Sequence, residues 1–202
     1  MIWDFVMTGG LVKKIFKILI IAFVAVFLIV FIRGCQGYRQ MSPYLSSEMF
    51  VMPKLEYNDN DIRSMEEKYL LLSHPENNRG EIVLLSSLDL NLILKEKAGL
   101  ESRIHCSLDD DHIGLLYSLP IPFFGKFFNG SMLFNLGVTD GTIDIDIQEV
   151  SANNISLDND SIDLLEQTIA KYSQTQEKVA RYLVYIDRVG LEKGNIVVKI
   201  AE

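Results

Sequence analysis

The chain has 202 residues and a formal net charge of −8, which allows one domain of ordinary size. Five of its 19 basic residues but only one of its 27 acidic residues lie in the first forty positions, so that segment carries +4 and the remainder carries −12. Proteins that bind nucleic acid meet the phosphates with clusters of Lys and Arg. The acidic remainder holds no such cluster, and we expect no nucleic-acid partner.

The first predicted element is a membrane anchor. Positions 18–32 are apolar and uncharged, but a helix of this length spans only ~22 Å of the ~30 Å hydrocarbon core. Starting the helix at Ile15 restores the length, because the Lys17 side chain can extend to the headgroups. We predict a transmembrane helix over 15–33 that contacts the lipid bilayer. The anchor residues singled out are Lys17, Ile18, Phe23, Phe27, Phe31 and Arg33.

The charges around the anchor predict its orientation. Three lysines precede it and two arginines follow it, so the positive-inside rule places residues 1–14 in the cytoplasm and the C-terminal part outside it. A cleaved signal peptide is an alternative, but no A-x-A site follows the apolar run. Lipidation at Cys35 is another, although Arg33 stands where a lipobox has a small residue. We favour an uncleaved anchor in the inner or cytoplasmic membrane.

After the anchor, residues 34–58 resemble a stalk, and residues 59–202 are expected to form one extracytoplasmic domain. Capping residues at 59–61 predict a helix that ends near Ser73. A short strand is expected over 81–85. Ser87 is the expected cap of a helix over 88–99 that Gly99 stops.

The middle of the domain is rich in predicted strands. Residues 103–108 and 113–121 form one predicted pair, and residues 131–138 and 142–150 form another. The second pair flanks Asp140-Gly141, which is a strong hairpin signal. Residues 143, 145 and 147 are all Ile and alternate with polar residues, so one face of this hairpin is expected to be buried.

A long amphipathic helix is predicted over 161–186. Its apolar stripe could form a coiled-coil seam with a partner, but such a stripe more often packs on the protein's own sheet. Two short strands are expected after it, the last over 196–200. Strands clustered between helices, without βαβ alternation, predict an α+β fold with an antiparallel sheet and packed helices.

No constellation in the sequence predicts catalysis, a metal or a cofactor. The acidic run 109–111 and the neighbouring His112 lack the spacing and glycine of a calcium loop, which favours a solvated hairpin tip. His105 and Cys106 are neighbours on a predicted strand and so face opposite sides. Cys35 is the only other cysteine, and no disulfide is expected between the two.

The aromatic stretch 117–130 is the strongest candidate for a contact surface. One interpretation is a strand end packed into the core, in which Pro120 and Pro122 prevent edge pairing. The other is an apolar lip that touches the membrane or closes over an apolar ligand. The candidate ligand or partner contacts are Tyr117, Phe123, Phe124, Phe127 and Phe128.

Several short pieces occur in a recognisable order: LNLIL at 90–94, SLPI at 118–121, GKFFNG at 125–130 and then Asp140-Gly141. Over roughly residues 82–200 the chain resembles bacterial membrane-anchored extracytoplasmic proteins of the YpmS-like type. The resemblance implies an envelope location and an α+β domain, and it carries no catalytic residue. In this sequence Asn153-Asn154 stands where that pattern has an Asn-Gly turn.

Three functions follow from these observations. The first is a membrane-anchored, non-catalytic domain that binds a protein partner or scaffolds an envelope assembly. The second is a module that binds a lipid or another apolar ligand near 123–128. The third is a hydrolase whose site combines dispersed acids with His105 or His112, and it requires one of these histidines beside a buried acid.

Overall fold

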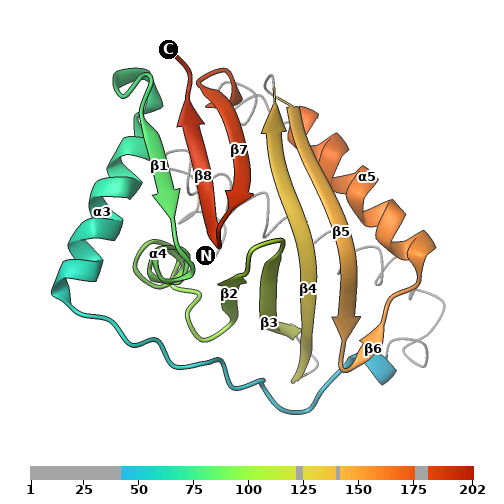
Figure 1. Ribbon diagram of the computed structural model, residues 1–202. Helices are drawn as coiled ribbons and strands as arrows, with labels where there is room; N and C mark the ends of the chain where they lie inside the picture. Colours follow the sequence, from blue (N-terminus) through green and yellow to red (C-terminus); the bar gives the residue numbers. More distant parts are fainter. Residues whose placement is uncertain (1–41, 122–124, 140–141, 176–181) are drawn as a thin grey trace.

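A computed structural model describes residues 42–121, 125–139, 142–175 and 182–202 (Figure 1). The predicted anchor over 15–33 therefore lies outside the described residues. Within the described ranges, no helix is both long and apolar enough to cross a membrane. The helical elements are η2 (Ser42–Tyr44), α3 (Asp59–Ser73), η3 (Pro75–Asn77), α4 (Ser87–Ile93), η4 (Leu94–Ala98) and α5 (Asn159–Thr175). The strands are β1 (Ile82–Leu85), β2 (Ile104–Leu108), β3 (Ile113–Ile121), β4 (Lys126–Thr139), β5 (Thr142–Ala152), β6 (Ile155–Ser156), β7 (Ile186–Glu192) and β8 (Asn195–Ile200).

The strands form one eight-stranded sheet that forks at β4. On one side β4 pairs with β5, from Gly130 opposite Ala152 to Thr139 opposite Thr142. On its other side β4 pairs first with β3 and then, at Val138 and Thr139, with β7. The branch β3–β2 and the branch β7–β8–β1 therefore lie one after the other along the same edge of β4 (Figure 1). All pairs are antiparallel, which confirms the predicted α+β fold with an antiparallel sheet.

Helix α4 lies between the two branches and contacts both β1 and β2. The buried Asn91 side chain accepts a hydrogen bond from the Cys106 N–H at 2.8 Å and donates one to the Cys106 carbonyl at 2.6 Å. Ser87 Oγ accepts a further bond from the Leu108 N–H. Side chains of α4 thus take the place of a neighbouring strand along this part of β2, which would otherwise be an open edge.

One hydrophobic core lies between the sheet and the helices. Ile162, Leu165 and Ile169 of α5 are buried, and this helix packs on β5. The described part of the apolar stripe therefore packs on the protein's own sheet. Near the other end of the core, the rings of Tyr117 and Phe128 stack with centroids 5.7 Å apart.

Several predicted boundaries need correction. Strand β4 begins at Lys126 and not at 131, because residues 126–130 pair with residues 117–121 of β3. Much of the stretch predicted as an aromatic connection is therefore strand. The N-cap of α4 is Ser86, whose capping box uses Asp89. Ile186, predicted to end the long helix, is a buried residue of β7.

The described part of the predicted stalk lies against the domain. Tyr44, Leu45 and Tyr57 pack on the core, and Ser46 forms an isolated antiparallel bridge with Phe127. Asn58 then caps α3 in a reciprocal box with Asp61. Contacts at Tyr44, Leu45, Ser46 and Tyr57 thus hold this segment on the domain, while most of its other residues are exposed.

Candidate functional site

The segment 46–51, here called the strap, crosses the sheet face that lies opposite the core. Its first contact is a pair of 2.9 Å backbone hydrogen bonds between Ser46 and Phe127. Further along, the Glu48 carbonyl accepts a bond from Asn129 Nδ2 at 2.8 Å, and the Phe50 N–H donates to Ser118 Oγ at 3.1 Å. Ser118 is fully buried and donates in turn to Asn129 Oδ1 at 2.6 Å.

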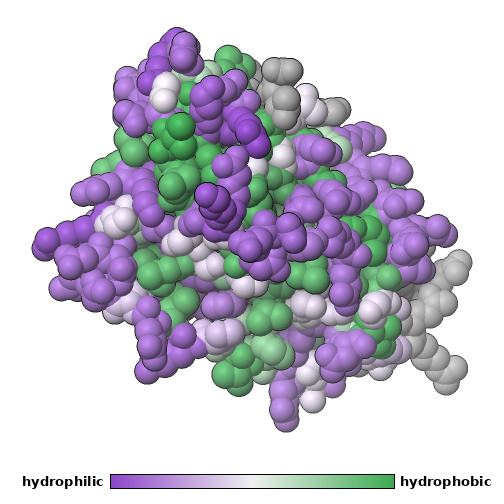
Figure 2. All heavy atoms as spheres, in the orientation of Figure 1, coloured by the Kyte–Doolittle hydropathy of each residue, from purple (hydrophilic) through white to green (hydrophobic). Residues whose placement is uncertain are grey.

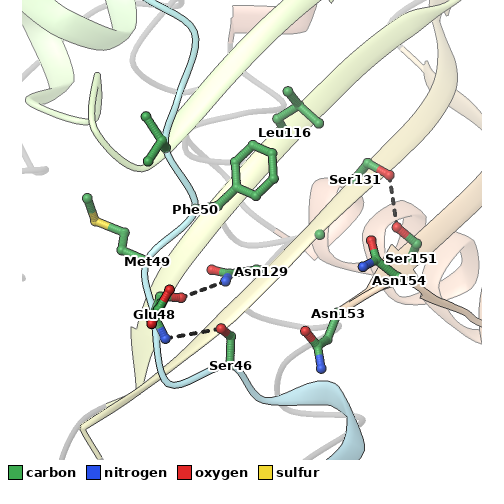
Figure 3. A pocket seen from close by; sticks show the side chains of 12 residues that line it. Ser46, Glu48, Met49, Phe50, Leu116, Asn129, Ser131, Ser151, Asn153 and Asn154 are labelled. Carbon is green, nitrogen blue, oxygen red and sulfur yellow. Dashed lines mark hydrogen bonds between the residues drawn. The ribbon is translucent and has the colours of Figure 1, made fainter.

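A groove of about 600 Å³ lies between the strap and the sheet (Figure 3). Ser118, Asn129 and Ser131 point to its side because alternate residues of a strand share a face and Ser118 pairs with Asn129 in register. Ser151 of β5 pairs directly with Ser131. The lining residues are Ser46, Glu48, Met49, Phe50 and Val51 of the strap region and Leu116, Asn129, Gly130, Ser131, Ser151, Asn153 and Asn154 of the sheet.

The groove combines an apolar wall with an uncharged polar wall. Phe50 is 45% exposed and Val51 is 85% exposed, although both are large apolar residues. Figure 3 shows Phe50 and Leu116 to one side and Ser131, Ser151 and Asn154 to the other. Glu48 is the sole charged residue among those that line the groove, and no Lys or Arg is among them.

The β5–β6 turn completes the polar wall. Asn153 and Asn154 both have positive φ, at 50° and 62°, a conformation that Asn tolerates better than most residues. The pair Asn-Asn therefore supports the tight turn that Asn-Gly would form. Asn153 Nδ2 donates to the Pro43 carbonyl at 2.7 Å, so this turn also holds the chain just before the strap.

Gly130 lies beneath the groove where three groups crowd together. A Cβ atom at this position would clash with the Ser151 carbonyl oxygen and would lie 2.5 Å from the Tyr117 hydroxyl oxygen. The space is occupied because Tyr117 passes over Gly130 to donate a 2.6 Å hydrogen bond to that carbonyl. Burial also raises the pKa of the Tyr117 hydroxyl, so it stays a donor over the ordinary pH range.

The structure separates the aromatic residues predicted as ligand contacts. Tyr117 and Phe128 are buried core residues, which places their rings inside the domain. Phe127 is half-buried beside the bridge to Ser46. Phe123 and Phe124 lie outside the described residues, so the predicted apolar lip is described only in part.

The histidines of the candidate hydrolase site do not meet a buried acid within the described residues. His112 lies 3.6 Å from Asp109, which is exposed. The backbone N–H groups of Asp111 and His112 lower the pKa of Asp109, as in a solvated turn. Burial lowers the pKa of His105. The buried acid Asp89 instead accepts bonds from Lys68 and Ser86.

The described residues contain neither a metal site nor a reactive thiol. No group of three or more His, Cys, Asp or Glu residues there could hold a metal ion. Cys106 is a buried free thiol, and burial raises its pKa to about 12. A thiol with so high a pKa is a poor nucleophile at neutral pH.

A second apolar surface lies on the other branch of the sheet. Ile82 and Leu84 of β1 are both exposed, and Leu84 pairs with Val197 of β8. Figure 2 shows a hydrophobic patch over β1 and β8.

The strap is the functional candidate that the sequence prediction missed. One available signal was the run Met49-Phe50-Val51-Met52, which is more apolar than a solvated stalk requires. Comparison of the chain with protein-family models, with curated proteins and with solved structures gave no significant match.

Proposed function

We propose that this chain is a membrane-anchored, non-catalytic extracytoplasmic domain that scaffolds an envelope assembly by binding one of its components in the strap groove. The observation that carries the proposal is the groove itself. It places exposed apolar side chains opposite a polar wall in a volume typical of ligand sites. Its lining residues can bind a ligand through apolar contacts and hydrogen bonds. Among them no nucleophile is hydrogen-bonded to a general base, as nucleophilic catalysis would require.

The position of the groove in the chain supports a role close to the membrane. Eight residues lie between Arg33, the end of the predicted anchor, and Ser42, the first described residue. A fully extended chain of that length reaches about 30 Å. The strap begins four residues later, so an anchored chain would hold the groove near the membrane surface. The resemblance to YpmS-like anchored proteins favours the same location.

Site-specific crosslinking in intact membranes tests the binding role. A diazirine side chain would replace Phe50 in one full-length variant and Val184 in another. Val184 is 74% exposed and does not line the groove, so it is a matched control. We expect a discrete adduct from position 50 alone. Adding Ser131→Trp, which fills the groove, should abolish it. Equal adducts from both positions, or an adduct that Ser131→Trp leaves unchanged, would contradict the proposal.

The location has its own test. A reporter that is active only outside the cytoplasm is fused after Glu202, and the expected result is an active fusion. A fusion that is well expressed but inactive would reverse the orientation. Alkaline extraction of membranes would then check the anchor, because a transmembrane helix stays in the pellet while a peripheral protein is released.

A further inference from the structure

We propose that the strap groove binds an uncharged oligosaccharide. This inference rests on the proposed binding function and names the chemical class of its ligand. Three properties of the groove carry it: its charge, its hydrogen-bonding groups and the placement of its apolar side chains.

The charge of the groove excludes the common anionic ligands. Phosphate and carboxylate groups are normally met by Arg, Lys or helix N-termini. The lining contains no Lys or Arg, and its one charged residue is Glu48. The domain around it is also strongly acidic. An anionic lipid headgroup, a nucleotide or an acidic polymer would therefore be repelled. A single carboxylate at the rim also offers a cationic ligand little charge pairing, so the lining as a whole favours a neutral polar ligand.

The polar wall suits a ligand rich in hydroxyl groups. Hydroxyl and carboxamide side chains both donate and accept hydrogen bonds, as sugar hydroxyls do. Ser131 and Ser151 hydrogen-bond each other at 2.9 Å, which leaves capacity on both hydroxyls. The Asn154 side chain has no hydrogen-bond partner among the described residues and lies beside Ser151 (Figure 3). These three side chains form a small array of uncharged donors and acceptors.

The opposite wall suits the apolar face of a sugar ring. Phe50 is nearly half exposed, and Leu116 lines the same side of the groove (Figure 3). A pyranose presents C–H groups on one face and hydroxyl groups around its rim. It can therefore pack on Phe50 while its rim faces Ser131, Ser151 and Asn154. An aromatic ring makes such a contact at low cost in conformational entropy, because it has only two side-chain torsions.

Two other ligand classes fit the groove less well. An extended peptide gains its affinity by pairing with a free strand edge. The floor here is the face of β3, β4 and β5, whose backbone groups are already paired in register. An acyl chain prefers a cavity lined mainly by apolar side chains. Five Asn or Ser side chains of β4, β5 and the β5–β6 turn line this groove, and an acyl chain would remove water from them without offering hydrogen-bond partners.

Ligand-observed saturation-transfer NMR tests the proposal on the full-length chain in lipid nanodiscs, since maltoside detergents would compete. The probes are tri-N-acetylchitotriose, maltotriose, trigalacturonic acid and a neutral Gly-Ser peptide. We expect transfer to one or both neutral trisaccharides only. Phe50→Ala should weaken binding about tenfold, the scale of one aromatic contact. Ser131→Trp should abolish it, and Val184→Ala should leave it unchanged.

The outcomes separate the ligand class from the binding function. Transfer to the peptide or to the galacturonate but to neither neutral sugar would overturn the proposal. Equal binding by Phe50→Ala and Val184→Ala would overturn the assigned site, provided that both variants keep the parental melting temperature. If no sugar binds while position 50 still forms its adduct in membranes, the binding function stands and the ligand class is wrong. If both fail, the groove is not the binding site.

Discussion

Helix α4 and the strap are both fastened to the sheet by side-chain hydrogen bonds to backbone groups, but the two attachments differ in their access to water. Asn91 of α4 is 3% exposed, as is Cys106, to which it bonds. The strap is held through Ser118 and Asn129, while its own residues 48–51 are exposed. The first attachment is sealed in the core, whereas the second joins exposed strap residues to the buried Ser118 and the half-buried Asn129.

This difference assigns the two segments different roles. A buried hydrogen bond that is broken leaves groups that water cannot reach, so α4 is a fixed part of the fold. The exposed backbone groups of the strap can exchange their hydrogen bonds for bonds to water at lower cost. Local opening therefore requires less free energy for the strap than for α4. We therefore expect the strap, and not α4, to open first.

The largest expected effect comes from breaking the α4 attachment. Asn91→Ala leaves the N–H and the carbonyl of Cys106 buried without partners, at roughly 1–3 kcal/mol each. We expect a loss of about 2–5 kcal/mol in the free energy of unfolding, measured by urea titration. The control is Asn60→Ala, at an exposed position of α3, which should stay within ~0.5 kcal/mol. A similar loss in both variants would contradict the role given to Asn91.

The sequence predicts those parts of the fold whose causes are local. The helix from Asp59 follows from a capping box within four residues, and the β4–β5 hairpin follows from Asp-Gly between alternating runs. The alternation at 143–147 also predicts the side of β5 that faces the core. By contrast, the fork of the sheet depends on which strand pairs with the end of β4, and no local pattern encodes that choice.

The candidate site could not be predicted for a similar reason. Phe50 and Ser118 are 68 residues apart, and their contact exists only once β3 is in place. In the sequence, Ser118 looks like an ordinary polar residue at a strand end. The sequence instead indicated Tyr117 and Phe128 as candidate contact residues, and the structure places their rings in the core. The apolar run at 49–51 gave only a weak indication of a site. The sequence does not show that a sheet face lies beneath this run, because that contact forms only in the folded domain.

The next prediction concerns the floor of the groove. Gly130→Ala introduces a Cβ that must displace the Ser151 backbone and the Tyr117 ring. Overpacking of this kind typically costs about 1–3 kcal/mol, and we expect that loss in urea titration. Gly137→Ala on the same strand is the control, because its Cβ would meet only ordinary contacts at 3.8 Å or more. If Gly130→Ala is no less stable than Gly137→Ala, the crowding around Tyr117 is not as described.

Cys106 provides a pH-dependent test of the α4 attachment. Its pKa is raised from 9.0 to about 12 by burial, so the folded state holds its proton where the unfolded state loses it. The contribution of the protonated Cys106 thiol to the free energy of unfolding is fully present below pH 9 and is lost as the pH rises towards 12. Between pH 9 and 10.5 the loss is up to about 1.4 kcal/mol per pH unit.

The comparison uses a Cys35→Ser background, in which Cys106 is the only thiol. Unfolding free energy is followed from pH 8 to 10.5 with and without the further change Cys106→Ala. The Ala variant should show a flatter decline, even if its stability at pH 8 is lower. Parallel curves would mean that the thiol ionises as readily in the folded state as in the unfolded one, and that α4 does not seal this site.

The smallest effect is expected at the strap. Ser118→Ala removes the acceptor of the Phe50 N–H and the donor to Asn129. Phe50 is exposed and Asn129 is half-buried, so water can replace part of what is lost. We expect a loss of about 1 kcal/mol in global stability. Hydrogen exchange at the Phe50 amide should increase much more than exchange at the Cys106 amide. Ser131→Ala, which removes a groove hydroxyl that does not hold the strap, is the matched control. Unchanged protection at Phe50, or a global loss as large as that of Asn91→Ala, would remove the distinction between a fixed helix and a movable strap.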